Sequence, residues 1–159
     1  MKAASLKELK TELTHRSTQE LLELCLRLSK FKKENKELLT YLLFEAANET
    51  AYITSIKAQM DTAFDAINTK TYFYIKKSVR KILREQKKFI RYSQNKETEV
   101  ELLLYFCQKL KDFNPSIKRN TTLINLYNRQ LDYISKKVKT LHEDLQYDYE
   151  LELEELKNK

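Results

Sequence analysis

Residues 70–93 read KTYFYIKKSVRKILREQKKFIRYS, and this stretch decides the fold class. One set of its side chains recurs at the three- and four-residue spacing of an α-helix. The set consists of Ile75, Val79, Ile82, Leu83, Gln86, Phe89 and Ile90. We therefore expect an amphipathic helix that buries this face in a core and leaves the opposite face, rich in lysine and arginine, to solvent.

The composition of the whole chain also favours helices, because its 159 residues include no glycine and only one proline. Tight hairpins and most phosphate-binding loops need glycine, which adopts positive φ without steric cost. The composition therefore excludes a P-loop, a dinucleotide-binding fingerprint and a nucleophile elbow, since all are built from glycines. It predicts an all-α protein.

Apolar periodicity and capping residues predict where the helices lie. We expect helices at 5–14, 18–33, 35–47, 49–67, 70–93 and 97–113, and a last segment at 115–157 that divides near Thr140 as an alternative. Predicted starts are the pairs Ser5–Glu8, Ser17–Glu20 and Thr98–Glu101, and Asn114 followed by Pro115. Predicted ends, with asparagine in place of glycine, are Asn48, Asn68 and Asn95.

The helices are expected to form one domain over 1–159, with six or seven helices packed in antiparallel pairs. Two architectures remain open, an irregular helical bundle and a short array of the HEAT or armadillo type. The array is suggested by the triplet Glu-Leu-Leu at 20–22, 37–39 and 101–103, although leucine-rich helices also resemble one another by chance. A sub-boundary near 114–120 is an alternative.

Charge is distributed unevenly along the chain, whose net charge is +7. Residues 70–96 contain ten basic residues and one acid, a net charge of +9. The C-terminal segment 143–159 contains seven acids and two lysines, a net charge of −5. These two segments are the best candidates for partner binding.

A basic row follows helical spacing on the polar face of 70–93 and consists of Lys77, Lys81, Arg84, Lys88 and Arg91. Such a row spans about 20 Å and is long enough to meet several phosphates of a nucleic acid, with Tyr72, Tyr74 and Tyr92 beside it for base stacking. The alternatives are plain solvation, or pairing with the acidic segment in the chain or across a dimer. The acidic candidates are Glu143, Asp144, Asp148, Glu152 and Glu155.

No residue pattern indicates catalysis, a cofactor or a bound small molecule. His142 lacks the second histidine of a zinc-protease helix, because position 146 is glutamine. His15 with Glu12 matches the di-iron spacing once, but a di-iron bundle needs a second copy of that motif, which the chain lacks. Metal binding is therefore not expected. Cys25 and Cys107 both lie in leucine-rich stretches, and we expect each to act as a small core residue.

The chain is expected to be soluble and cytoplasmic. Residues 1–5 lack the apolar run of a signal peptide, and the longest apolar run, 102–107, is six residues long. A membrane span needs about 20 such residues, so no membrane partner is expected.

Four stretches carry a resemblance to a known family: YLLFE at 41–45, YFYIKKSVRKIL at 72–83, FIRYS at 89–93 and KETEVELLLYFC at 96–107. They resemble an uncharacterised family of small all-helical proteins found mainly in Bacteroidetes-type genomes. The resemblance covers residues 42–110 most directly. It implies a helical fold and a bacterial cytoplasmic setting, and it implies no activity or functional residue.

The sequence thus predicts a non-enzymatic interaction module that binds a protein partner or a second copy of itself. The alternative is a nucleic-acid-associated protein that uses the basic row of residues 76–91. An enzyme is the third and least favoured possibility.

Overall fold

The structure is a computed structural model that describes residues 1–158, and these form helices joined by turns and loops, with no strand. The all-α prediction is confirmed. The described residues form eight α-helices rather than six or seven. They are α1 (Leu6–Thr14), α2 (Thr18–Phe31), α3 (Lys33–Thr40), α4 (Glu49–Asp65), α5 (Tyr72–Ser93), α6 (Lys96–Lys111), α7 (Thr121–Val138) and α8 (Glu143–Lys157).

The extra helix arises because the last predicted segment divides at 139–142, close to the alternative division near Thr140. Two short elements complete the chain: a π-helix, η1 (Tyr41–Glu45), and a 3₁₀ helix, η2 (Ile117–Arg119). Contacts group the residues into two compact units, with α1 to α3 in residues 1–44 and α4 to α8 from residue 45 onward. The single domain over 1–159 and the sub-boundary near 114–120 stay predictions.

The second unit is built around α6, which is buried on several sides. Helices α4, α5, α7 and α8 all pack against it. A helix whose buried residues point to several sides needs more than one neighbour to cover them. The buried residues of α6 are Thr98, Val100, Leu102, Leu103, Leu104, Phe106, Cys107 and Leu110.

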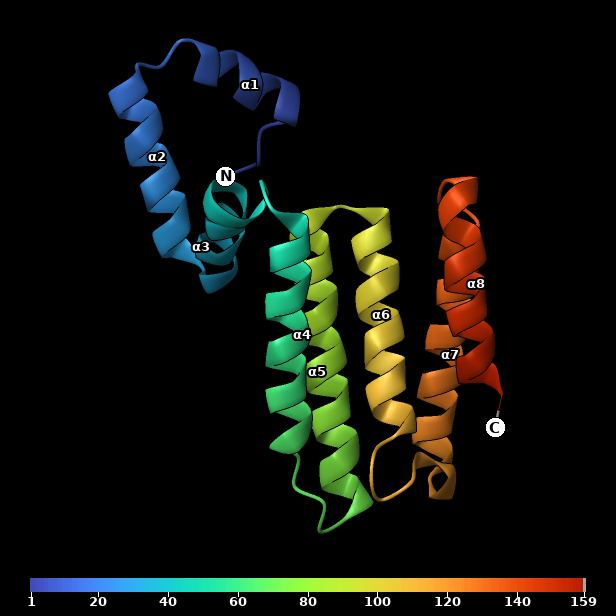
Figure 1. Cartoon of the computed structure of the whole chain (residues 1–159). Coiled ribbons are helices and arrows are strands. Elements are labelled where there is room, and N and C mark those ends of the chain that lie inside the picture. Colours follow the sequence, from blue (N-terminus) through green and yellow to red (C-terminus); the bar gives the residue numbers. More distant parts are fainter. Residues whose placement is uncertain (159) are drawn as a thin grey trace. The chain divides into compact units, whose positions relative to one another are not determined.

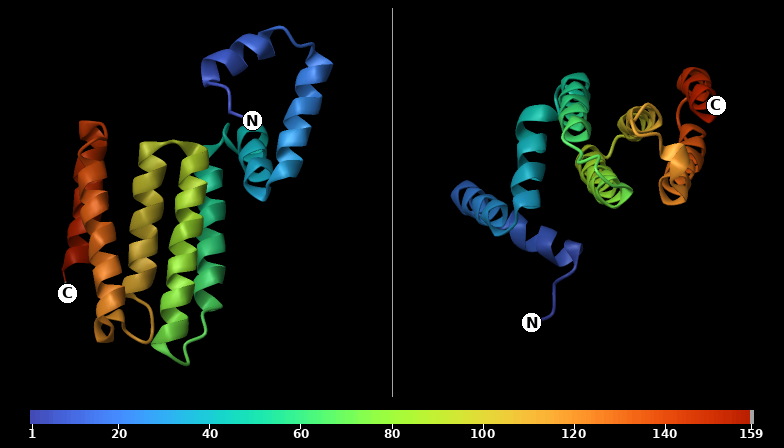
Figure 2. Two further views of the ribbon diagram at one scale, coloured as in Figure 1. Left: turned by 180° about the vertical axis from the view of Figure 1, so that it is seen from behind. Right: turned by 90° about the horizontal axis from the view of Figure 1, so that it is seen from below.

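The end-on view in Figure 2 shows two layers in this unit, with α4, α6 and α8 in one layer and α5 and α7 in the other. Successive helices of the unit connect at alternating ends in Figure 1. Helix α5 contacts α4 and α6, and helix α7 contacts α6 and α8. The HEAT- or armadillo-like array stays a prediction.

Helix α5 forms from the amphipathic stretch 70–93, and its buried residues are those of the predicted apolar face except Phe89. It ends at Gln94, which adopts the left-handed conformation at φ 54° and is the one residue of 1–158 with positive φ. Glycine commonly takes this position at the end of a helix. The predicted helix ends at Asn48 and Asn95 are wrong, because each of these residues begins the next helix. The predicted end at Asn68 is also wrong, since α4 ends at Asp65.

Asn48 and Asn95 instead begin the following helix. The side chain of Asn48 accepts the N–H of Ala51, and that of Asn95 accepts the N–H groups of Glu97 and Thr98. Asparagine is as favourable at a helix start as at a left-handed end, so residue type alone does not decide between the two. Since Asn95 caps α6, the predicted cap at Thr98 is wrong and Thr98 lies inside the helix.

Of the other predicted starts, the capping boxes of Ser5 with Glu8 and of Ser17 with Glu20 are confirmed. The start at Pro115 is wrong. The buried Ile117 and the hydrogen bond from Tyr72 to the Ser116 carbonyl hold this segment in a non-α conformation. Helix α7 begins later, with Asn120 as its cap.

Candidate interaction surfaces

The basic row lies on α5 opposite its buried face. Lys77, Lys81, Arg84 and Arg91 are exposed, whereas Lys88 is half-buried with Nζ 5.2 Å from the centroid of the Phe89 ring. The predicted row therefore exists as a positively charged strip along one helix. Its geometry follows from helical spacing alone.

The acidic candidates lie on α8, which packs against α6 and α7 and buries Leu153 and Leu156. All five predicted acidic residues are exposed; they are Glu143, Asp144, Asp148, Glu152 and Glu155. The strong negative charge of this helix thus faces solvent rather than the core.

The structure does not bring the two charged surfaces together. Helix α5 lies against α4 and α6, while α8 lies on the other side of α6 (Figure 2). Within residues 1–158, none of Lys77, Lys81, Arg84 and Arg91 forms an ion pair with α8. These four charges are not neutralised by the acidic segment of the same chain, so solvation or a partner accounts for them.

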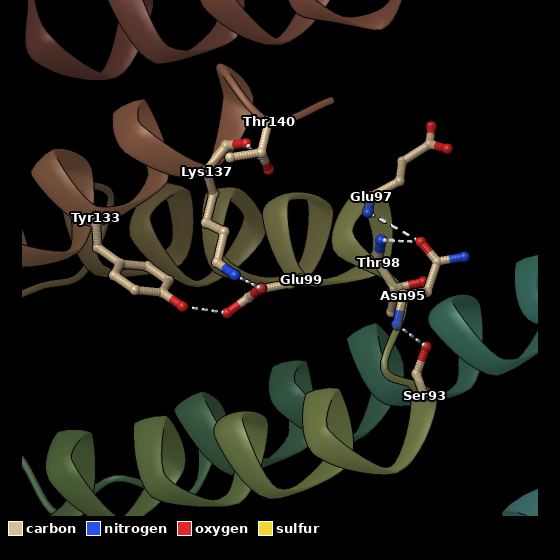
Figure 3. Close-up of polar contacts among 8 residues, drawn as sticks. All are labelled: Ser93, Asn95, Glu97, Thr98, Glu99, Tyr133, Lys137 and Thr140. Carbon is tan, nitrogen blue, oxygen red and sulfur yellow. Dashed lines mark hydrogen bonds and ion pairs between the residues drawn. The ribbon is translucent and has the colours of Figure 1, made fainter. Parts of the chain in front are cut away.

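The carboxylates of α6 have structural partners, as Figure 3 shows for Glu99. The Glu99 carboxylate accepts a 2.5 Å hydrogen bond from the Tyr133 hydroxyl and lies 3.1 Å from Nζ of Lys137. This carboxylate raises the pKa of Lys137, because it stabilises the ammonium form. Glu99 therefore joins α6 to α7 and does not act as a free acid.

A groove of about 430 Å³ lies where α4, α6 and α8 meet. Lys57 of α4 and Glu101 of α6 line it and form a 2.7 Å ion pair, and Tyr149, Glu152 and Glu155 line the α8 side. Burial raises the pKa of Glu152, and the charge of Glu101 raises it further. Three carboxylates against one lysine give this groove a negative charge.

Groups that could bind a metal ion do not converge in the described part of the chain. Residues 1–158 contain no group of three or more His, Cys, Asp or Glu side chains that fits a metal ion. His15 lies at the end of α1, and His142 caps α8 by accepting the N–H of Asp144. Both histidines therefore occupy helix ends.

The cysteine prediction is confirmed for Cys107 and wrong for Cys25. Cys107 is buried in α6, and burial raises its pKa to about 12. Cys25 is exposed on α2, because the first unit encloses almost no core. A leucine-rich stretch is buried only where another element covers it.

The first unit exposes a leucine surface that the sequence did not predict. Ser29 is the one buried residue of α1, α2 and α3, although these helices are rich in leucine. We use the name leucine surface for the exposed residues Leu6, Leu9, Leu13, Leu22, Leu24, Leu26, Leu28, Phe31 and Leu38 taken together. On α2 they occupy two opposite faces, with Leu22 and Leu26 on one and Leu24, Leu28 and Phe31 on the other. The density of leucine in residues 5–42 was the available signal, but leucine spacing does not show whether a partner helix covers it.

Comparison of the chain with protein-family models, curated proteins and solved structures finds no match. None of the helices described in residues 1–158 has the length and apolar character needed to cross a membrane.

Proposed function

We propose that the protein is a non-enzymatic interaction module that binds a protein partner, or a second copy of itself, through the leucine surface of its first unit. The observation that carries the proposal is the exposure of nine large apolar side chains on α1, α2 and α3. Leu6, Leu9 and Leu13 share one face of α1, and an exposed apolar patch of this kind marks an interaction site on a protein whose surface is otherwise polar.

The energetics of the first unit support this proposal. Helices of nine, 14 and eight residues are marginal in water by themselves, because helix nucleation is unfavourable and few bonds offset it. Units of about 40 residues without disulfides usually need another surface to complete a core. Binding a partner would remove the leucine surface from water and supply that core.

A photo-crosslinking residue at position 26 tests the proposal, with position 150 as the matched control. Leu26 lies on the leucine surface of α2, whereas Glu150 is an exposed residue of α8. In cells that express the native protein, we expect protein adducts from position 26 and none from position 150. Equal adducts from both positions, or none from either, would overturn the proposal.

The second candidate function is nucleic-acid association through the basic row. It is favoured by the exposure of Lys77, Lys81, Arg84 and Arg91 and by their lack of ion pairs with α8. Exposed Phe73 and Tyr74 at the start of the same helix offer rings for base stacking.

Three further expectations stay proposals. They are membership of the uncharacterised helical family found in Bacteroidetes-type genomes, a cytoplasmic location, and an architecture of antiparallel helix pairs. Purification of the protein from its native host, followed by identification of the proteins bound to it, would test the partner proposals, because the sequence does not identify a partner.

A further inference from the structure

Helix α1 presents an apolar stripe that no other part of the first unit covers. Leu6, Leu9 and Leu13 follow helical spacing and are 85%, 47% and 43% exposed. No residue of α1 is buried. A nine-residue helix with its apolar stripe in water has little to stabilise it apart from its capping box.

The same unit contains an apolar groove between α2 and α3. It has a volume of about 230 Å³ and is lined by Cys25, Leu28, Leu38, Leu39 and Leu42 together with Ser29 and Asn35. The two polar side chains are already bonded, since Ser29 donates to the Cys25 carbonyl and Asn35 donates to the Leu28 carbonyl, both at 2.8 Å. The groove therefore offers apolar contact rather than a site for a polar ligand.

We propose that α1 of one copy docks into the α2–α3 groove of a second copy, and that the exchange is reciprocal. This inference rests on the proposed function and names a second copy as the partner. Each chain carries both the stripe and the groove, so a two-fold dimer satisfies both at once. An amphipathic helix in an apolar groove is a common mode of recognition.

The amount of exposed surface fits such a dimer. The α1 stripe and the exposed groove residues Leu28, Leu38 and Leu42 together expose about as much as three complete large side chains. At roughly 200 Å² each this is about 600 Å² per chain, or about 1,200 Å² for a reciprocal dimer, which is the lower end of the range for specific interfaces. Charge does not oppose docking, because Lys7 and Lys10 balance Glu8 and Glu12 within α1.

The connection between α1 and α2 favours exchange over closure onto the same chain. The N–H groups of His15 and Arg16 bond the carbonyls of Glu12 and Leu13, and the Arg16 guanidinium lies 3.8 Å from the Glu12 carboxylate. With the capping box of Ser17, these contacts define the angle at which α1 leaves α2. Figure 1 shows α1 diverging from α2 at this turn.

Disulfide trapping tests the arrangement on the full chain. Leu9→Cys places a thiol on the stripe, and the natural Cys25 supplies its partner in the groove. On oxidation at about 10 μM, we expect a reducible species of twice the chain mass that disappears when Cys25→Ser is added. Thr11→Cys, on the opposite side of α1, is the matched control and is expected to stay a single chain.

Light scattering provides the second measurement, with circular dichroism to show that the variants stay helical. We expect a dimer for the native chain and for Thr11→Glu, and a loss of dimer for Leu9→Glu. A native chain of single mass, or a disulfide formed only within one chain, would overturn the exchange. If in that case position 26 still crosslinks another protein, the proposed function stands; if it yields no adduct, both proposals fail.

Discussion

The Thr98 hydroxyl donates a 2.7 Å hydrogen bond to Oε1 of Glu49, and this bond joins the first turn of α6 to the first residue of α4. The same carboxylate oxygen accepts a hydrogen bond from the Ser93 hydroxyl at the end of α5. A carboxylate at helix N-termini is also stabilised by the helix dipoles. Three helices of the second unit are thus connected at one end by a single side chain.

We predict that Thr98→Val lowers the free energy of unfolding by about 1–2 kcal/mol. Thr98 is 1% exposed, so valine fills its volume but leaves a carboxylate without one of its donors. Urea denaturation measures the change. Thr62→Val is the matched control, because Thr62 is exposed on α4, and an equal loss in both variants would contradict the prediction.

Gln94→Gly is expected to stabilise the protein by about 0.5–1 kcal/mol. Gln94 holds φ at 54°, where a side chain is unfavourable and glycine is not. Lys87→Gly, at an exposed site inside the same helix, should instead destabilise by about 1 kcal/mol. Thermal unfolding separates the two, and a loss of stability in both variants would show that the left-handed position carries no strain.

Glu152→Gln should raise the melting temperature at neutral pH and leave it unchanged in acid. The pKa of Glu152 is raised above 4.5, so its ionised form is less stable in the folded chain than in the unfolded one. This destabilisation is present above the folded pKa and disappears below the unfolded value. Since the residue is exposed, we expect a gain of only about 1 °C.

Calorimetry between pH 3 and pH 8 measures this dependence, with Glu150→Gln on the same helix as the control. A gain that persisted at pH 3, or that appeared equally in the control, would show that the charge of Glu152 is not its cause.

The basic row predicts salt-sensitive binding to DNA or heparin if the second candidate function holds. Reversing Lys77, Lys81 and Arg84 to glutamate should weaken retention and reduce the slope of log affinity against log salt by about one for each phosphate that the chain no longer neutralises. Lys118, Lys136 and Lys139, exposed elsewhere in the second unit, give a control with the same change of charge. Absence of retention of the native chain at low salt would exclude nucleic-acid binding.

Local features of the fold were predictable from the sequence because they depend on neighbouring residues. The amphipathic period of 72–93, the capping boxes at Ser5 and Ser17 and the lack of strands all follow from spacing and residue type. At Asn48 and Asn95, neighbouring residues are not enough to predict the local structure. Each lies between two helices, and the side chain suits either the end of one or the start of the next.

The candidate surfaces divide in the same way. The basic row was predictable, because helical spacing alone places its side chains on one face of α5. Its separation from the acidic residues of α8 was not, since that depends on α6 lying between the two helices. The exposure of Cys25 and the burial of Cys107 also depend on neighbours that leucine-rich sequence does not reveal.

The sequence by itself determined the all-helical class and the charge of each helix face, because 159 residues without glycine and with helical periodicity leave little else to form. Tertiary structure alone decided which apolar faces are covered. In α6 four neighbouring helices remove the leucines from water, whereas most leucines of α1 and α2 stay exposed even though α3 packs against α2. Burial depends on what packs against a side chain, and the sequence of one helix does not show which element that is.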